Sequence, residues 1–106
     1  MKRYGMVIGL RPEAEKSYRE HHANVWPEVL AMIRACNIAN YSIYLHEGKL
    51  FSYFEYTGAD FAGDMAKMAA DPATQRWWTL MKPMQFPLSD GPDAWWTEID
   101  EVFHTD

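Results

Sequence analysis

The sequence is poor in cysteine and in clustered positive charge. Cys36 is its single cysteine, so no internal disulfide can form, which suits a reducing compartment. There are 10 Lys and Arg residues against 15 Asp and Glu, giving a net charge of -5, and the basic residues form no cluster. Nucleic acids and anionic membranes are bound by clustered basic residues, so we expect neither as a partner.

Long apolar segments are also absent. No stretch reaches the roughly 20 apolar residues that a membrane-spanning helix needs. Residues 1–6 lack the apolar run of a signal peptide. Together with the cysteine usage, this favours a soluble, cytoplasmic protein.

Several motifs of catalysis and cofactor binding are missing. Histidine and cysteine nowhere show the His-x-x-x-His or Cys-x-x-Cys spacing of metal sites. The sequence has neither a glycine-rich phosphate loop nor a Gly-x-Ser-x-Gly motif, and no partner base is evident near Cys36. These absences argue against a metal site and against hydride or phosphoryl transfer.

Aromatic side chains, in contrast, are abundant. The chain has 106 residues, enough for one domain over residues 1–106, and 48% of them are hydrophobic. Its five Trp and six Tyr residues exceed what a small core usually needs. We expect the surplus rings to line a pocket or a subunit interface.

Turn residues and apolar periodicity predict the secondary structure. Pro12 suits the first position of a helix, which should run to about Cys36. A kink or break is expected near residues 23–26, because Pro27 cannot donate to the Ala23 carbonyl. Asp71 is the expected N-cap of a later helix. The expected strands are residues 4–10, 41–45, 50–56 and 95–104, with helices at 12–36, 61–70 and 72–81, a turn at 46–49 and a loop at 83–93.

The order β-α-β-β-α-β is the ferredoxin-like arrangement of the α+β class. Helices then cover one face of a four-stranded sheet and leave the other face bare. That face would carry aromatic residues, so we expect a second copy of the chain to cover it, forming a homodimer.

His22 is the first candidate for chemistry. Tyr18, His22 and Trp26 are spaced i, i+4, i+8, which stacks them on one face of a continuous helix. His22 would end a helical segment, where free carbonyls should keep its pKa near or above about 6.5, suited to acid–base catalysis. His21 would point about 100° away. The same spacing equally fits core packing of Tyr18 and Trp26 with His22 at the edge.

Two further groups of aromatic residues could contact a ligand. Trp77 and Trp78 are adjacent on a short helix, so one should pack in the core and the other reach a cleft or an interface. Tyr41 and Tyr44 fall on opposite faces of a strand, so one of them should face the helices. Packing alone would also explain each group.

Together, these segments resemble the L-rhamnose mutarotase family. The resemblance spans nearly the whole chain, in the same order and with nearly the same spacing. The matching segments are Tyr18-x-x-x-His22, Val25-Trp26-Pro27-Glu28, Asn40-Tyr41-Ser42-Ile43-Tyr44-Leu45, Gln75-Arg76-Trp77-Trp78 and Glu101-Val102-Phe103-His104.

The resemblance implies a dimeric α+β barrel of ferredoxin-like protomers that exchanges sugar anomers without a metal or an organic cofactor. It implies that His22 is the catalytic acid, and that Tyr18, Tyr41, Trp77 and Trp78 contact the substrate. That substrate is expected to be a monosaccharide, a 6-deoxy-L-sugar, with L-rhamnose as the first choice and L-fucose as the alternative.

One segment departs from the family. An Asn-Pro-Asp-Asn-Ser-like segment typically follows the tryptophan helix, whereas residues 84–93 here contain Phe86 and Leu88 and precede Trp95-Trp96. A loop that lines the pocket or bridges the dimer has therefore changed. This change affects the expected identity of the sugar more than the expected reaction. A dimeric α+β barrel that only binds a small ligand is a competing hypothesis. Another is a monooxygenase or isomerase acting on an aromatic substrate with His22 as base.

Overall fold

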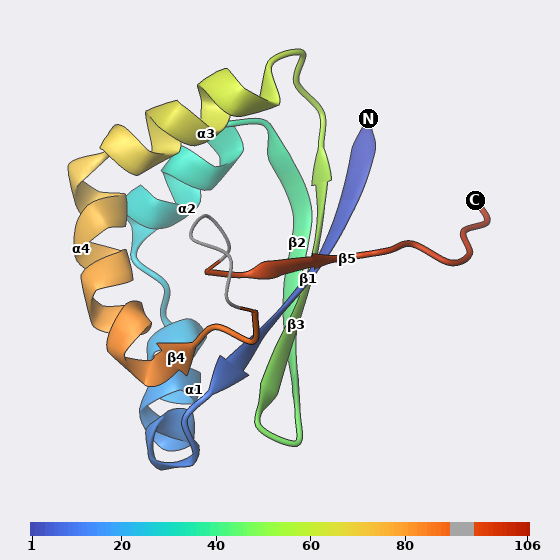
Figure 1. Ribbon diagram of the computed structural model, residues 1–106. Coiled ribbons are helices and arrows are strands. Elements are labelled where there is room, and N and C mark those ends of the chain that lie inside the picture. Colours follow the sequence, from blue (N-terminus) through green and yellow to red (C-terminus); the bar gives the residue numbers. More distant parts are fainter. Residues whose placement is uncertain (90–94) are drawn as a thin grey trace.

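The helices lie on one side of a curved antiparallel sheet in the computed structural model, which describes residues 1–89 and 95–106 (Figure 1). This arrangement confirms the expected α+β class. The strands are β1 (Lys2–Leu10), β2 (Ile38–His46), β3 (Lys49–Tyr56), β4 (Gln85–Phe86) and β5 (Thr97–Ile99). The α-helices are α1 (Glu15–Ala23), α2 (Pro27–Ala35), α3 (Phe61–Ala70) and α4 (Pro72–Met81), with 3-10 turns η1 (Pro12–Ala14) and η2 (Lys82–Met84).

β1 is the centre of the sheet, whose strand order is β2-β3-β1-β4. It pairs along nearly its whole length with β3, from Lys2 opposite Tyr56 to Gly9 opposite Lys49. Its other edge is shared, because β4 pairs with residues 9–10 and β5 with residues 5–7. This is the strand order that the ferredoxin-like arrangement requires.

The hairpin between β2 and β3 closes through the turn expected at residues 46–49. Glu47 and Gly48 both have positive φ, 49° and 74°, as in a tight two-residue hairpin turn. The two strands are longer than expected, since β2 already begins at Ile38 and β3 at Lys49. The hairpin therefore supplies two of the strands that face the helices.

A bulge near the start of β2 decides which tyrosine faces the helices. The register of β2 against β3 shifts around Asn40, which has a φ of 50°. The extra residue reverses the alternation of side chains along the strand. Tyr41 consequently packs edge-on against the buried Phe54, while Tyr44 pairs with Phe51 and faces away from the helices. The expected opposite placement of the two tyrosines is confirmed.

The helices begin and end where the capping residues predict. The expected break separates α1 from α2, which starts at Pro27, the first helical position. Asp60 accepts a hydrogen bond from the backbone of Gly63 at the start of α3. Asp71 does the same for Thr74 at the start of α4, as expected for an N-cap.

Two expectations about the C-terminal part of the chain are wrong. The strand expected at residues 95–104 covers only Thr97–Ile99, because the following segment leaves the sheet edge (Figure 1). Val102 and Phe103 are 94% and 80% exposed there. The loop expected at residues 83–93 contains a 3-10 turn and β4, and its part from residue 90 onward lies outside the described residues.

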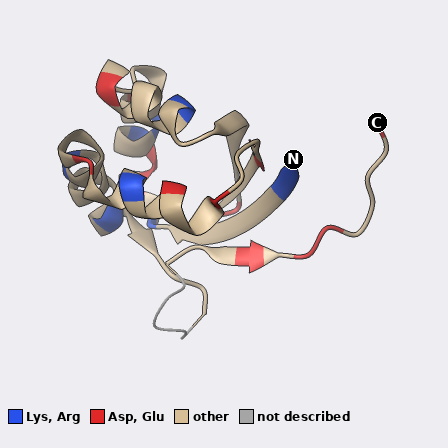
Figure 2. Cartoon of the chain, turned by 90° about the horizontal axis from the view of Figure 1, so that it is seen from above, with Lys and Arg blue, Asp and Glu red and all other residues tan. Residues whose placement is uncertain are grey.

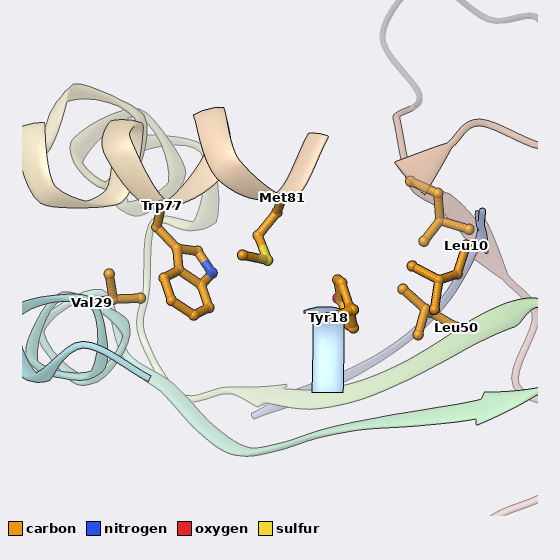
Figure 3. Packing of buried hydrophobic residues seen from close by; sticks show 7 residues of the cluster. Leu10, Tyr18, Val29, Leu50, Trp77 and Met81 are labelled. Carbon is orange, nitrogen blue, oxygen red and sulfur yellow. The ribbon is translucent and has the colours of Figure 1, made fainter. Parts of the chain in front are cut away.

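The core consists of two clusters between the sheet and the helices. The larger one joins α1, α2 and α4 to β1 and β3, and Figure 3 shows Trp77 and Met81 extending from α4 towards the sheet. The smaller one packs α3 against the other end of the sheet. The larger cluster contains Ile8, Leu10, Tyr18, Val29, Leu50, Trp77 and Met81, and the smaller one Tyr4, Ile38, Phe54 and Tyr56.

The face of the sheet away from the helices carries aromatic rings, as expected. Phe51 and Tyr53 alternate along β3 with the buried Ser52 and Phe54, so they project outwards. Tyr44 lies on the same face and is 65% exposed. Tyr44, Phe51 and Tyr53 together are called the open-face patch below.

Charged residues of the two signs are interspersed over the helices rather than separated (Figure 2). Several of them pair within one helix, such as Arg19 with Glu15 on α1. Within the described part of the chain, no helix is long and apolar enough to cross a membrane.

Candidate active site

A cavity of about 1180 Å³ lies between the inner face of the sheet and the helices. Residues from α1, β2 and α4 line it, although these elements are far apart in the sequence. All five residues predicted for the site are among them: Tyr18, His22, Tyr41, Trp77 and Trp78. The structure thus brings the predicted residues to one place, and their roles stay a prediction.

His22 is held in one tautomer by the helix that carries it. Its Nδ1 lies 2.8 Å from the carbonyl oxygen of Tyr18. A carbonyl oxygen only accepts hydrogen bonds, so Nδ1 carries the proton and the neutral ring has its lone pair on Nε2. The imidazole stacks on the Tyr18 ring at 4.1 Å and meets Trp77 edge-on at 5.3 Å, which fixes its plane.

Burial lowers the pKa of His22 below its usual 6.5. The hydrogen bond to the Tyr18 carbonyl acts in the opposite direction, and the neighbouring His21 lowers the pKa further. The expectation that free helix carbonyls keep this pKa near or above 6.5 is therefore wrong, because desolvation outweighs them. Near neutral pH, His22 is an uncharged base.

His21 is directed elsewhere, as its position on the helix predicts. Its Nδ1 lies 2.8 Å from the carbonyl oxygen of Ser17, and its ring is 6.2 Å from that of Trp77. It is not among the residues that line the cavity. His21 is therefore a natural control for His22.

Two tyrosine hydroxyls stay protonated in the cavity. Burial raises the pKa of Tyr18 to about 12, and a hydrogen bond from Gln85 partly opposes this shift. Desolvation likewise raises the pKa of Tyr41 to about 12, with a smaller contribution from Tyr18. As a residue, Tyr41 is 43% exposed, and its ring packs against Phe54. Both groups can donate a hydrogen bond to a ligand at physiological pH.

The two adjacent tryptophans have different environments, as expected. Trp77 is 6% exposed and packs edge-on against Trp26 at 5.2 Å. Trp78 is half-buried, with the Lys82 ammonium 5.9 Å from its ring centre. Trp77 thus belongs to both the core and the cavity wall, whereas Trp78 contributes mainly to the wall.

Gln85 is a cavity residue that the sequence analysis misses. Its amide is buried, with Nε2 donating to the Tyr18 hydroxyl at 3.3 Å and Oε1 accepting from the Trp95 indole at 2.8 Å. The sequence offers only a weak indication of this role, namely one amide residue between Met84 and Phe86, inside a segment expected to be a loop. Only the pairing of β4 with β1 turns this side chain inwards.

The changed segment and the tryptophan pair that follows it reach the cavity only in part. Phe86 packs over Gly9, where an added Cβ would lie 2.3 Å from its ring. Neither Phe86 nor Leu88 lines the cavity, whereas Gln85 does. Trp95 and Trp96, which follow this segment, do line the cavity. The apolar rings that reach the cavity here are therefore these two tryptophans, and not Phe86 or Leu88.

The chemistry that the cavity offers is proton transfer. It combines one neutral imidazole with phenol hydroxyls, indole rings and an amide. Over residues 1–89 and 95–106, no group of three or more His, Cys, Asp or Glu side chains could hold a metal ion.

The fold and the cavity together define an α+β half-barrel protein equipped to move protons on a small polar ligand. The family model described as L-rhamnose mutarotase matches residues 3–105. The chain belongs to the L-rhamnose mutarotase family, and it is an isomerase of the kind that interconverts anomers.

Relatives of known sequence agree with this assignment, and two solved structures share the fold. The chain is similar over its full length to the whole L-rhamnose mutarotases of Oceanobacillus iheyensis, 35% identical, and Bacillus subtilis, 33% identical. The crystal structure of an L-rhamnose mutarotase from Formosa agariphila superposes over all of both chains with a TM-score of 0.79 at 22% identity. The tetracenomycin F2 cyclase of Streptomyces glaucescens, at 10% identity and a TM-score of 0.71 over all of both chains, shares the fold alone.

Proposed function

We propose that the protein interconverts the α and β anomers of L-rhamnose by acid–base-catalysed opening and closing of the sugar ring. The observation that carries the proposal is the neutral His22 imidazole, with Nε2 as its unprotonated nitrogen, in a cavity also lined by Tyr18, Tyr41, Trp77 and Trp78. The full-length similarity to proteins named L-rhamnose mutarotase supports the choice of sugar.

His22 carries the proton in both directions. Its Nε2 takes the proton of the anomeric hydroxyl, a C1=O double bond forms, and the bond from C1 to the ring oxygen breaks. The electron pair of that bond stays on the ring oxygen, which receives the proton from the imidazolium. After C1 rotates, the same steps in reverse close the ring on the other face, and His22 is neutral again.

The remaining cavity residues hold the sugar during this rotation. Indole rings of Trp77 and Trp78 suit the C–H faces of the sugar, and the protonated hydroxyls of Tyr18 and Tyr41 suit its oxygens. Held in this way, the aldehyde recloses before it leaves. A cavity lined largely by apolar side chains should also accept the 6-methyl group more readily than a hydroxymethyl group.

The protein works as a homodimer in the cytoplasm in this proposal. The exposed Tyr44 and the half-buried Phe51 and Tyr53 of the open-face patch support a covering second copy. The single, buried and unpaired Cys36 supports a reducing compartment. A monomer in light scattering at micromolar concentration would contradict the first statement, and activity found outside the cytosolic fraction of the source cells would contradict the second.

Anomeric exchange measured by saturation-transfer NMR tests the function. We expect purified protein to accelerate exchange of L-rhamnose most, and to act faster on L-rhamnose and L-fucose than on L-mannose and L-galactose. A preference for L-fucose would replace the substrate but keep the reaction. Acceleration of none of the four sugars would overturn the proposal in favour of a binding protein.

A further inference from the structure

A chain of two hydrogen bonds leads from Trp95 through Gln85 to Tyr18. An indole N–H is only a donor, so the side-chain oxygen of Gln85 must face Trp95, at 2.8 Å. The amide nitrogen of Gln85 then faces Tyr18 and donates to its hydroxyl oxygen at 3.3 Å. Gln85 is 5% exposed, so water does not compete for these contacts as it would at the surface.

We propose that Gln85, oriented by Trp95, is a positioning residue that turns the hydroxyl proton of Tyr18 into the cavity. A phenol oxygen that accepts from the amide directs its own O–H away from it. Within the described part of the chain, this hydroxyl donates to no acceptor, and Tyr18 lines the cavity. Its proton is therefore available to a ligand.

The inference rests on the proposed function, because it assigns this proton a place on the sugar. The ring oxygen of a pyranose carries no hydrogen and can only accept. A fixed O–H donor matches it, and the hydrogen bond strengthens as the bond to C1 breaks and negative charge develops on that oxygen. Gln85 acts through Tyr18 and need not touch the sugar.

Substitutions of Gln85 distinguish two roles for this residue: orienting the Tyr18 hydroxyl by a hydrogen bond, and filling space in the core. Gln85→Met keeps the size of the side chain and removes the donor. We expect kcat for anomeric exchange to fall about 10-fold with little change in KM, the effect of one misdirected hydrogen bond in the transition state. A side chain that only fills space would tolerate this change, so an unchanged kcat would overturn the inference.

Gln85→Glu reverses the hydrogen bond to Tyr18. The introduced carboxylate still accepts from Trp95, but it also accepts from Tyr18 and so draws the hydroxyl proton out of the cavity. We expect kcat to fall at least as far as in Gln85→Met. Relative to the wild-type protein at the same pH, kcat should recover in part as the pH is lowered and the carboxyl becomes a donor. Gln75→Glu on the exposed side of α4 is the matched control and should keep full activity. Full activity of Gln85→Glu at high pH would contradict the inference.

Two measurements identify which hypothesis fails. In a Tyr18→Phe background, Gln85→Met should have no further effect on kcat if it acts through Tyr18, and additive losses would overturn the inference. The Trp95 indole N–H signal in NMR should lose its protection from exchange in Gln85→Met, without any sugar present. If the wild-type protein accelerates no sugar, the proposed function fails; if it is active and Gln85→Met equals it, only the positioning role fails.

Discussion

The imidazole of His22 donates from Nδ1 to the carbonyl oxygen of Tyr18, one helical turn earlier, at 2.8 Å. One backbone contact thereby settles which nitrogen is free for chemistry, because the carbonyl cannot serve as a donor. The same two residues also stack ring on ring. The proposed base and the proposed ring-oxygen donor are thus held by a single turn of α1.

Removing the imidazole should remove catalysis. We expect His22→Ala to lower accelerated anomeric exchange on the order of 100-fold or more, because the proton carrier is lost. His21→Ala is the control, since that ring lies outside the cavity, and should change exchange far less. Saturation-transfer NMR measures the rates, and circular dichroism verifies that both variants are folded. Equal losses in the two variants would contradict the assignment.

The pH dependence of exchange should follow the free base. Because burial lowers the pKa of His22, the neutral form predominates from below pH 6.5 upwards. We expect kcat/KM to rise with pH below 6.5 and to level off through the neutral range. The tyrosines, with pKa values of about 12, should not limit this plateau. A rate that falls between pH 6 and 8 would instead indicate that His22 works as an acid in its resting form.

The same residue should link stability to pH. The pKa of His22 is lower in the folded protein than in the unfolded chain, where it is about 6.5. The unfolded chain therefore binds the proton first as pH falls, so the stabilising contribution is present above pH 6.5 and is lost below it. Urea unfolding at pH 7.5 and 5.5 should show a loss at the lower pH that is smaller in His22→Ala. An equal loss in both proteins would exclude His22 as its source.

Substitutions of the two adjacent tryptophans should affect different properties, Trp77 mainly stability and Trp78 mainly sugar binding. Trp77→Ala empties a buried core position and should lower the free energy of unfolding by about 3–5 kcal/mol. Trp78→Ala removes a half-buried ring, so it should weaken sugar binding with a much smaller change in stability. Urea unfolding and calorimetric titration with L-rhamnose measure the two effects. Similar losses of stability in both variants would contradict the division of roles.

The open-face patch should be needed for dimer formation. Tyr44 is 65% exposed in the single chain, so Tyr44→Lys should leave the fold of the protomer intact. A buried lysine at a subunit contact is unfavourable, and we expect the dimer to dissociate at least 10-fold more readily. Thr79→Lys, on the exposed side of α4, is the control. Analytical ultracentrifugation of both variants measures the dissociation of the dimer. If the two variants sediment identically, the patch is not the interface.

Local signals predict most of the helices and the hairpin. Asp71 followed by Pro72 predicts the start of α4, and Pro27 predicts the break before α2, since both depend on backbone chemistry within a few residues. The strand at residues 95–104 was overestimated at both ends. β4 pairs with residues 9–10 of β1 and so limits where β5 can begin. After Ile99 the chain leaves the edge of β1, which no local pattern marks.

The candidate site was predictable in composition but not in detail. The spacing of Tyr18 and His22 places them together on any helix, so their proximity follows from the sequence. Which of Tyr41 and Tyr44 faces the helices depends on the bulge at Asn40, which alternation alone does not show. The lowered pKa of His22 depends on how much of the protein surrounds it, and Gln85 reaches Tyr18 only because β4 pairs with β1.

The walls of the cavity come from α1, β2 and α4, so no continuous segment of the chain can form the site alone. A bound sugar therefore stabilises only the fully folded protein. At a free concentration 100 times its dissociation constant, it would raise the free energy of unfolding by about 2.7 kcal/mol. Such a ligand raises the melting temperature of the whole domain in one transition. Thermal denaturation can therefore identify the preferred sugar even where anomeric exchange is too fast to be measured.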